Sequence, residues 1–268
     1  MEGGLGMSAR ASRLRPHFDL PRLAFVGAIF AVVLLIWQGY VSLIYDQAVP
    51  LPTPMSTVEA FIEMSGSGEL REASLESAQA LLLGSIPGIV LGIVFGLVIG
   101  AVRPLNTSLS PYIFAFYATP FPALIPIFVL LFGLGNLGKS MIVFTLVITT
   151  VVLQTVAGVR NVDARFLEVA RSFGSHPART LIEVQLPASM SFIVAGIRLA
   201  IGRALVGVVV AEFDTALSGL GALIFRYSGR LQLSHAFVPA VVFSVTGIVV
   251  YIALRKAEQG LEKWRQPG

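Results

Sequence analysis

Long apolar runs recur along this chain, each close to the length that a helix needs to cross a bilayer. A transmembrane helix requires about 20 predominantly apolar residues. The composition agrees with such helices, since 55% of the residues are hydrophobic and only 13% are charged, whereas globular domains carry about 25% charged residues. The sequence therefore predicts an all-α polytopic membrane protein with six transmembrane helices, at residues 23–45, 77–102, 112–134, 140–159, 189–211 and 237–254.

The first apolar run could instead belong to a cleaved signal peptide. Signal peptides have an apolar region of about 7–15 residues that ends at a small-residue cleavage site. The run at 23–45 is longer and shows no such site before Tyr45, so we predict a transmembrane helix. The segment 46–76 that follows is rich in acidic residues, and Leu51–Pro54 makes its first part extended. We expect an outer loop with a surface helix there.

The distribution of Lys and Arg predicts the orientation, because these residues are in excess on the cytoplasmic side of membrane proteins. Six crossings place both termini on one side. The outer segments would hold only Arg71, Lys139, Arg226 and Arg230. The inner segments would hold Arg10, Arg13, Arg15, Arg22, Arg103, Arg160, Arg165, Arg171, Arg179, Arg255, Lys256, Lys263 and Arg265. We therefore expect cytoplasmic tails at residues 1–22 and 257–268.

Composition also excludes several functions. The chain has no cysteine, and its three histidines, His17, His176 and His235, are scattered, so we expect no disulfide, no metal site and no redox chemistry. The net charge of +4 reports membrane orientation rather than affinity for nucleic acid, which we do not expect as a partner.

Glycine recurs every fourth residue in the second predicted span, at Gly84, Gly88, Gly92, Gly96 and Gly100. This spacing places the glycines on one side of a helix, where another backbone can approach closely. Glycine is also common in membrane helices in general, but the full run favours a packing surface.

The third predicted span contains Pro120, Pro122 and Pro126, each of which removes a helical hydrogen bond. Broken helices at membrane depth often line transport paths, although a simple packing kink is the alternative. Arg198 and Arg203 lie in the fifth predicted span, and Glu212 lies at its outer end. The two arginines are five residues apart and cannot share one helix face, so at most one lines a path. We name Arg198, Glu212 and the three prolines as candidates for the translocation path.

One polar stretch, Glu168–Pro187, interrupts the apolar runs and is called the polar segment below. It predicts a short helix, a loop with Gly174 and Pro177, a second short helix and a stop at Pro187. Glycine can adopt a positive φ at the end of the first helix. Arg165 and Arg171 are both within helical pairing distance of Glu168.

The polar segment resembles the coupling loop of binding-protein-dependent ABC importer permeases. Their signature is Glu-Ala-Ala, three residues, Gly, nine residues and Ile-x-Leu-Pro. Glu168, Val169, Ala170, Gly174, Val184, Leu186 and Pro187 stand at those positions, with valine replacing alanine at 169 and isoleucine at 184. Further stretches are similar to the sulfonate, taurine and nitrate subgroup: Leu51–Pro54, Pro120–Ser140, Gly158–Asp163, Ala195–Leu205, Val209–Phe213 and Ser218–Ile224.

The resemblance implies a type I ABC importer permease fold over about residues 70–256, with a coupling loop at 160–188. It implies a homodimer in the bacterial inner membrane, two cytoplasmic ATPase subunits and an extracytoplasmic solute-binding protein. The chain would be a transport subunit without ATPase motifs and without a bound cofactor, since ATP and Mg²⁺ would bind the partner subunits. The residues that would couple to the ATPase are Glu168, Ala170, Arg171, Gly174, Leu186 and Pro187.

Two other functions are compatible with a polytopic membrane protein. An intramembrane enzyme needs a nucleophile and base, paired carboxylates or metal ligands, and no such cluster is visible in the sequence. An ion-driven transporter would need buried carboxylates to bind its coupling ions, and Glu212, at the outer end of the fifth predicted span, is the single candidate for this role. A small organic or inorganic solute, moved by alternating access, is the expected substrate.

Overall fold

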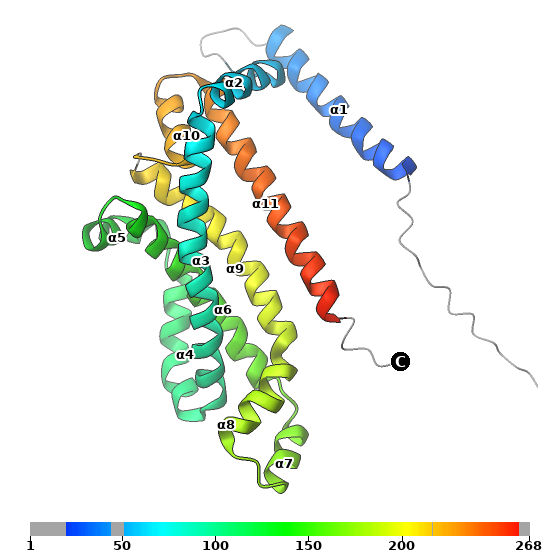
Figure 1. Ribbon diagram of the computed structural model, residues 1–268, viewed down its shortest axis with the longest axis vertical. Coiled ribbons are helices and arrows are strands. Elements are labelled where there is room, and N and C mark those ends of the chain that lie inside the picture. Colours follow the sequence, from blue (N-terminus) through cyan, green and yellow to red (C-terminus); the bar gives the residue numbers. More distant parts are fainter. Residues whose placement is uncertain (1–19, 44–50, 216, 263–268) are drawn as a thin grey trace, which may run out of the picture.

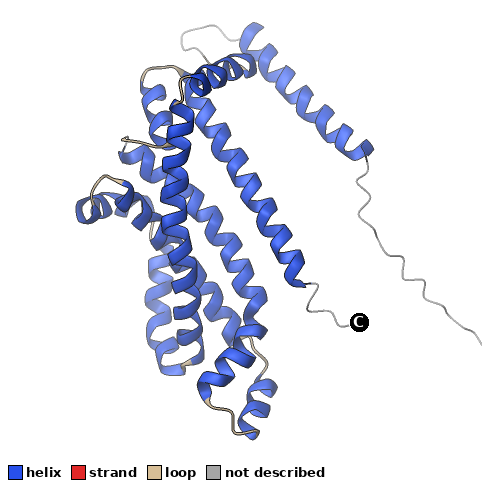
Figure 2. Cartoon of the chain, viewed as in Figure 1, coloured by secondary structure: helices blue, strands red, loops and turns tan. Residues whose placement is uncertain are grey.

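The computed structural model describes residues 20–43, 51–215 and 217–262, and every regular element in those ranges is a helix (Figure 2). The predicted all-α fold is confirmed. The 3-10 helix is η1 (Phe121–Leu124) and the π-helix is η2 (Leu181–Gln185). The α-helices are α1 (Leu20–Leu43), α2 (Pro54–Gly66), α3 (Glu69–Ala101), α4 (Arg103–Ala118), α5 (Ile125–Phe132), α6 (Asn136–Arg160), α7 (Ala164–Ser172), α8 (Pro177–Thr180), α9 (Leu186–Thr215), α10 (Leu220–Gly229) and α11 (Leu233–Glu262).

The long helices α3, α6 and α9 form the centre of a bundle, and α7 and α8 lie together at one end of it (Figure 1). The polar segment thus projects from one end, whereas α2 and α10 lie at the opposite end. Helix α1 stands apart from the bundle and approaches it near its own C-terminal end, where the ring of Trp37 lies 5.8 Å from that of Phe237 on α11.

Four helices are long and apolar enough to cross a membrane, namely α3, α6, the continuous helix Pro177–Thr215 and Leu233–Lys256 of α11. The third predicted span differs from a single helix over 112–134. It comprises α4, which starts earlier at Arg103, and a second arm, Phe121–Phe132, bent from α4 by 93°. Counted as one span, this pair gives a fifth crossing. The predicted span at 23–45 falls on α1, Leu20–Leu43, and its last two residues lie outside the described ranges.

The glycine ladder of α3 lies directly against α6. A Cβ added at Gly92 would lie 2.8 Å from Cβ of Val151, and one added at Gly96 would lie 2.5 Å from Cβ of Thr155, closer than carbon atoms can approach. Each glycine meets a β-branched residue of α6, in the order Val143, Val147, Val151, Thr155 and Val159. Branched side chains therefore occupy the space that the absent Cβ atoms leave.

Helix α9 also packs closely against α6 at glycine positions. Gly158 of α6 lies against Phe192 and Ser189, and Gly196 of α9 lies against the side chain of Gln154. Val147, Ala200, Ala204 and Val208 are among the buried residues of the resulting core. Small residues at helix contacts let backbones approach closely, which favours van der Waals packing in a bilayer.

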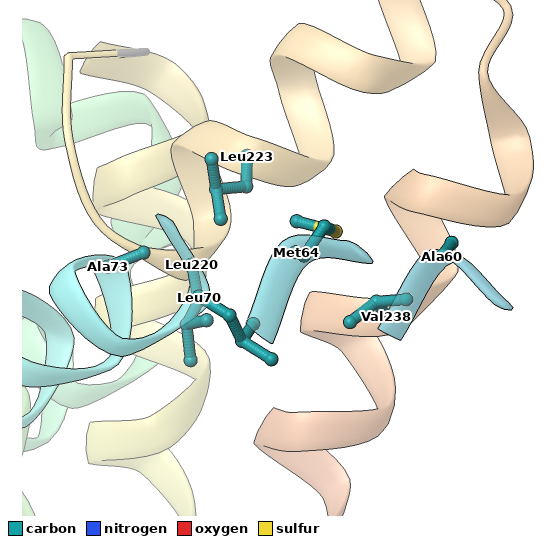
Figure 3. Packing of buried hydrophobic residues seen from close by; sticks show 7 residues of the cluster. All are labelled: Ala60, Met64, Leu70, Ala73, Leu220, Leu223 and Val238. Atoms are coloured by element: carbon teal, nitrogen blue, oxygen red, sulfur yellow. The ribbon is translucent and has the colours of Figure 1, made fainter. Parts of the chain in front are cut away.

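A second core closes the end of the bundle opposite the polar segment. Figure 3 shows Ala60 and Met64 of α2, Leu70 and Ala73 of α3, Leu220 and Leu223 of α10, and Val238 of α11. Polar contacts surround this core: Tyr227 donates a hydrogen bond of 2.6 Å to Glu69, and Arg226 lies 3.1 Å from the same carboxylate. Helices α2, α3, α10 and α11 are thereby tied together.

Candidate functional site

The polar segment begins with α7, whose start and end are both explained by local residues. The carboxylate of Asp163 caps the helix by accepting a hydrogen bond of 2.9 Å from the backbone N–H of Arg165. At the other end Gly174 has φ +70°. The N–H of Ser175 donates to the carbonyl of Ala170, and the N–H of Gly174 donates to that of Arg171. These two bonds form a Schellman motif, which requires a left-handed residue such as glycine.

The second part of the polar segment differs from the prediction. The expected stop at Pro187 is wrong, because α8, η2 and α9 form one continuous helix from Pro177 to Thr215. Pro187 is the second residue of α9 but lies inside the continuous helix, where a proline removes one helical hydrogen bond. The preceding π-helical turn, in which the N–H of Leu186 bonds the carbonyl of Leu181, accommodates the altered hydrogen bonding.

One face of α7 is apolar and exposed. Phe166 is 61% exposed, Val169 55% and Phe173, just after the helix, 86%. Their spacing of three and four residues places them on the same side. Large apolar side chains grouped in this way on a polar helix are typical of an interaction surface.

The charged residues of the polar segment are also exposed. Glu168 forms no ion pair in the part of the chain that the structure describes, and Arg165 lies 3.3 Å from Asp163 instead. Arg179 and Glu183 form an exposed pair at 2.8 Å. Arg171 lines a cavity of about 360 Å³ between the last turn of α3 and the polar segment. Leu186 is half-buried and Pro187 is exposed.

The prolines of the third span mark the break between α4 and α5. Pro120 precedes η1, Pro122 lies within it and Pro126 lies in the first turn of α5. Pro122 lines a cavity between this break, α6 and α9, to which α9 contributes Arg203. Arg198 is not among the residues that line this cavity. The structure thus distinguishes the two arginines, with Arg203 beside the broken span.

Glu212, the other candidate for the path, is enclosed in a buried polar network. Its side chain is 0% exposed and that of Lys139 is 1% exposed, and Oε1 of Glu212 lies 3.7 Å from Nζ of Lys139. Ser77 donates to the carboxylate at 2.8 Å, as does the N–H of Gly221 at 2.9 Å. Lys139 donates to the carbonyl and hydroxyl of Ser218. The network joins α3, α6, α9 and the turn before α10.

The prediction that the chain has no ATPase motif is wrong for the sequence pattern, because one stretch has the residue spacing of such a motif. Residues Gly133–Ser140, Gly-Leu-Gly-Asn-Leu-Gly-Lys-Ser, match the pattern of a phosphate-binding loop. Such a loop follows a β-strand, whereas this stretch joins α5 to α6. The ammonium of Lys139, which would have to reach a phosphate, is buried against Ser218 and Glu212. The match in spacing therefore does not form a nucleotide site.

Sequence reasoning missed two features. The sequence predicts Lys139 only as a charge in an outer segment, because it does not show that this residue is buried beside Glu212. The sequence prediction also does not include the exposed aromatic side chains of Phe166 and Phe173, although their seven-residue spacing indicates a shared helix face. No group of residues that could hold a metal ion occurs within the described ranges.

These features define a helical, polytopic membrane protein with a broken span and a polar segment that projects from one end. The family described as "Binding-protein-dependent transport system inner membrane component" matches residues 88–263. The chain belongs to this family, since the match covers more than half of it.

Several relatives cover most of the chain. The putative aliphatic sulfonates transport permease protein SsuC of Bacillus subtilis is 33% identical over 235 residues, or 88% of this chain and 85% of the relative. The protein of the same name from Escherichia coli is 32% identical, over 87% and 88%. The riboflavin transport system permease protein RibX of Chloroflexus aurantiacus is 29% identical, over 92% of each. The chain is therefore an ABC transporter permease subunit of the inner membrane.

Proposed function

We propose that this chain is the membrane-spanning subunit of an ATP-driven importer that takes up a small, sulfonate-like solute. It acts as a homodimer with two cytoplasmic ATPase subunits and an extracytoplasmic solute-binding protein. Both termini and the polar segment lie in the cytoplasm. ATP and Mg²⁺ bind the ATPase subunits, and closure of those subunits moves the permease helices between inward-open and outward-open arrangements.

The observation that carries the proposal is the shape of the polar segment. A coupling element must be exposed, must offer apolar side chains to a groove on another protein, and must be joined firmly to the spans. Phe166, Val169 and Phe173 provide the apolar face, and the Schellman motif at Gly174 fixes the end of α7. The continuous helix Pro177–Thr215 connects the segment directly to a membrane span.

The substrate class is supported by two relatives whose names specify aliphatic sulfonates. The relative that is named for riboflavin transport supports the alternative, another small solute taken up by the same kind of system. In either case the permease contributes the path, and the binding protein selects the solute.

Co-purification tests the proposal. The tagged chain, solubilised mildly from its native host, is expected to bring down an ATPase subunit, and proteoliposomes with the binding protein are expected to accumulate an alkanesulfonate only when ATP is present. A matched variant, Phe173→Ser, should insert normally and lose the ATPase subunit. Purification of the wild-type chain without any ATPase subunit would contradict the importer function.

Orientation has its own test, which the absence of cysteine makes simple. Single cysteines are introduced at Ser175 in the polar segment and at Ser67 between α2 and α3. A membrane-impermeant maleimide added to intact spheroplasts should label Ser67→Cys and spare Ser175→Cys. The reverse pattern would show that the chain is inserted with the opposite orientation.

A further inference from the structure

Two adjoining cavities lie where the broken span meets α6 and α9. The larger has a volume of about 320 Å³, at the lower end of the range for small-molecule sites. Apart from Arg203, its side chains are apolar and include Phe121, Ile125, Leu146 and Val206. The smaller, about 160 Å³, has a polar lining from Tyr117, Thr119, Thr145 and Thr149. Both are lined by Phe121, Leu146 and Arg203, so Arg203 lies at their junction.

Arg203 is the charged residue of both linings. Its guanidinium stacks on the ring of Tyr117, with Cζ 3.8 Å from the ring centroid. Stacking uses the flat face of a guanidinium and leaves the N–H groups at its edge available. Within the described ranges no carboxylate lies within ion-pair distance of Arg203. A charged side chain at membrane depth is costly unless it meets an opposite charge or water, so this site favours an anion.

The nearby threonine hydroxyls do not compete with Arg203 as donors. Thr145 donates to the carbonyl of Met141 at 2.7 Å, Thr149 to that of Thr145 at 2.6 Å, and Thr119 to that of Ala115 at 2.9 Å. A hydroxyl has a single proton, and each of these protons is used within its own helix. The guanidinium is therefore the charged group that can donate hydrogen bonds to an anionic ligand. The hydroxyl of Tyr117, which also lines the smaller cavity, is a neutral donor beside it, while the side chains of the larger cavity other than Arg203 offer only apolar contact.

We propose that these cavities form a binding site for a small monoanion with a short alkyl group. The anionic group binds the edge of Arg203, and the alkyl group occupies the cavity formed by Phe121, Ile125, Leu146 and Val206. A single cation selects a single negative charge, and the apolar lining selects an alkyl tail over a polar one. The inference rests on the proposed transport function and adds to it a site in the permease itself.

Direct binding to the permease tests this site without its partner subunits. The full-length chain in nanodiscs is titrated with butanesulfonate, pentanesulfonate and hexanesulfonate in a calorimeter. Binding should be saturable, and affinity should rise about fourfold per added methylene until the cavity is filled. Hexan-1-ol and hexylammonium have the same tail without the negative charge, and both should bind at least about tenfold more weakly.

Substitutions separate the charge from the cavity. Arg203→Gln should weaken hexanesulfonate binding by about tenfold or more and leave the binding of hexan-1-ol unchanged. Arg203→Lys should retain the preference for anions with lower affinity, and thermal unfolding verifies that both variants are folded. Gly202→Leu fills the larger cavity, since a Cβ at Gly202 meets nothing within 4 Å, and should weaken hexanesulfonate more than butanesulfonate. Arg103→Gln, an exposed arginine on α4, is the matched control.

Three outcomes would overturn the site: binding that does not saturate, equal binding by Arg203→Gln and wild type, or loss of binding in Arg198→Gln with Arg203→Gln unaffected. A negative result in these binding experiments can be told apart from a failure of the proposed transport function. ATP-dependent uptake without alkanesulfonate binding by the isolated permease would eliminate this site and leave the importer intact.

Discussion

Nζ of Lys139 lies 3.7 Å from Oε1 of Glu212, and neither side chain reaches solvent. The pair joins the start of α6 to the end of α9, and Ser77 of α3 completes the carboxylate's hydrogen bonds. A buried charge whose partner is removed is strongly destabilising, because the remaining charge has lost its water without compensation.

Lys139→Met is therefore expected to destabilise the protein by about 3–5 kcal/mol, measured by thermal unfolding in detergent. The double variant Lys139→Met/Glu212→Gln should recover much of this loss, because the amide oxygen can still accept from Ser77 and Gly221 without a charge. The exposed Arg71→Met serves as a control. A loss from Lys139→Met no greater than that of the control would show that the ion pair does not stabilise the bundle.

Gly92→Ala should weaken the contact between α3 and α6, because the added Cβ would lie 2.8 Å from Cβ of Val151. We expect a loss of about 1–3 kcal/mol, the usual cost of overpacking. Gly39→Ala on α1, where nothing lies within 4 Å, should have no such cost. Equal melting temperatures for Gly92→Ala and Gly39→Ala would contradict close packing at Gly92.

Phe173→Ser should abolish retention of the ATPase subunit while the melting temperature of the isolated permease stays within a few degrees of wild type. The reason is that Phe173 is 86% exposed and so contributes little to the permease's own core. Leu217→Ser replaces an exposed apolar residue at the opposite end of the bundle and should retain the subunit. Retention by both variants would exclude the apolar face of α7 as the contact.

Gly174→Val tests the conformation of the polar segment. Gly174 has φ +70°, in the left-handed region of backbone conformation. A residue with a Cβ is destabilised there by about 1–2 kcal/mol. The substitution should displace Ser175 and Pro177 relative to α7 and reduce ATP-driven uptake severalfold, with normal membrane insertion. Gly229→Val, at a glycine with open space and no such φ, is the comparison. Full uptake by Gly174→Val would exclude a role for this turn.

Tyr227 predicts a dependence of stability on alkaline pH. Burial, followed by the hydrogen bond to Glu69, raises the pKa of Tyr227 from its ordinary 10.0 to about 12. Between these values the unfolded chain has lost the phenolic proton while the folded chain retains it, so stability falls as pH rises from about 10 to about 12. Tyr227→Phe should be less stable below pH 10 and show a shallower decline above it, measured by denaturation across this range. Parallel curves for the two proteins would contradict the shifted pKa.

The helical bundle could be predicted because the bilayer sets the length of an apolar run, and a four-residue glycine period has meaning only on a helix. The register of α6 against that ladder could not, since it depends on which β-branched residues of a distant segment meet the glycines. The stop expected at Pro187 failed for a local reason. A π-helical turn directly before Pro187 lets the helix continue through the proline, and the sequence does not show that turn.

The site was predictable where its residues are close together in the chain. Gly174 and its flanking residues formed a recognisable signature, and the turn has the positive φ expected of it. Lys139 and Arg203 were harder, because the roles of both depend on residues brought near by tertiary packing. The sequence favoured Arg198 as the path residue, and only the arrangement of α6, α9 and the broken span shows that Arg203 is the arginine that lines the cavity there.

The glycine contacts between α3 and α6 also limit how this protein can move. Val143 and the four other β-branched side chains of α6 each pack against one glycine of α3. Sliding one helix along the other would break these five contacts. Helix α6 has 25 residues, which at about 1.5 Å per residue makes it about 37 Å long. We therefore expect α3 and α6 to tilt together as one unit when the polar segment moves, which would carry the displacement from the polar segment to the Lys139 end of α6.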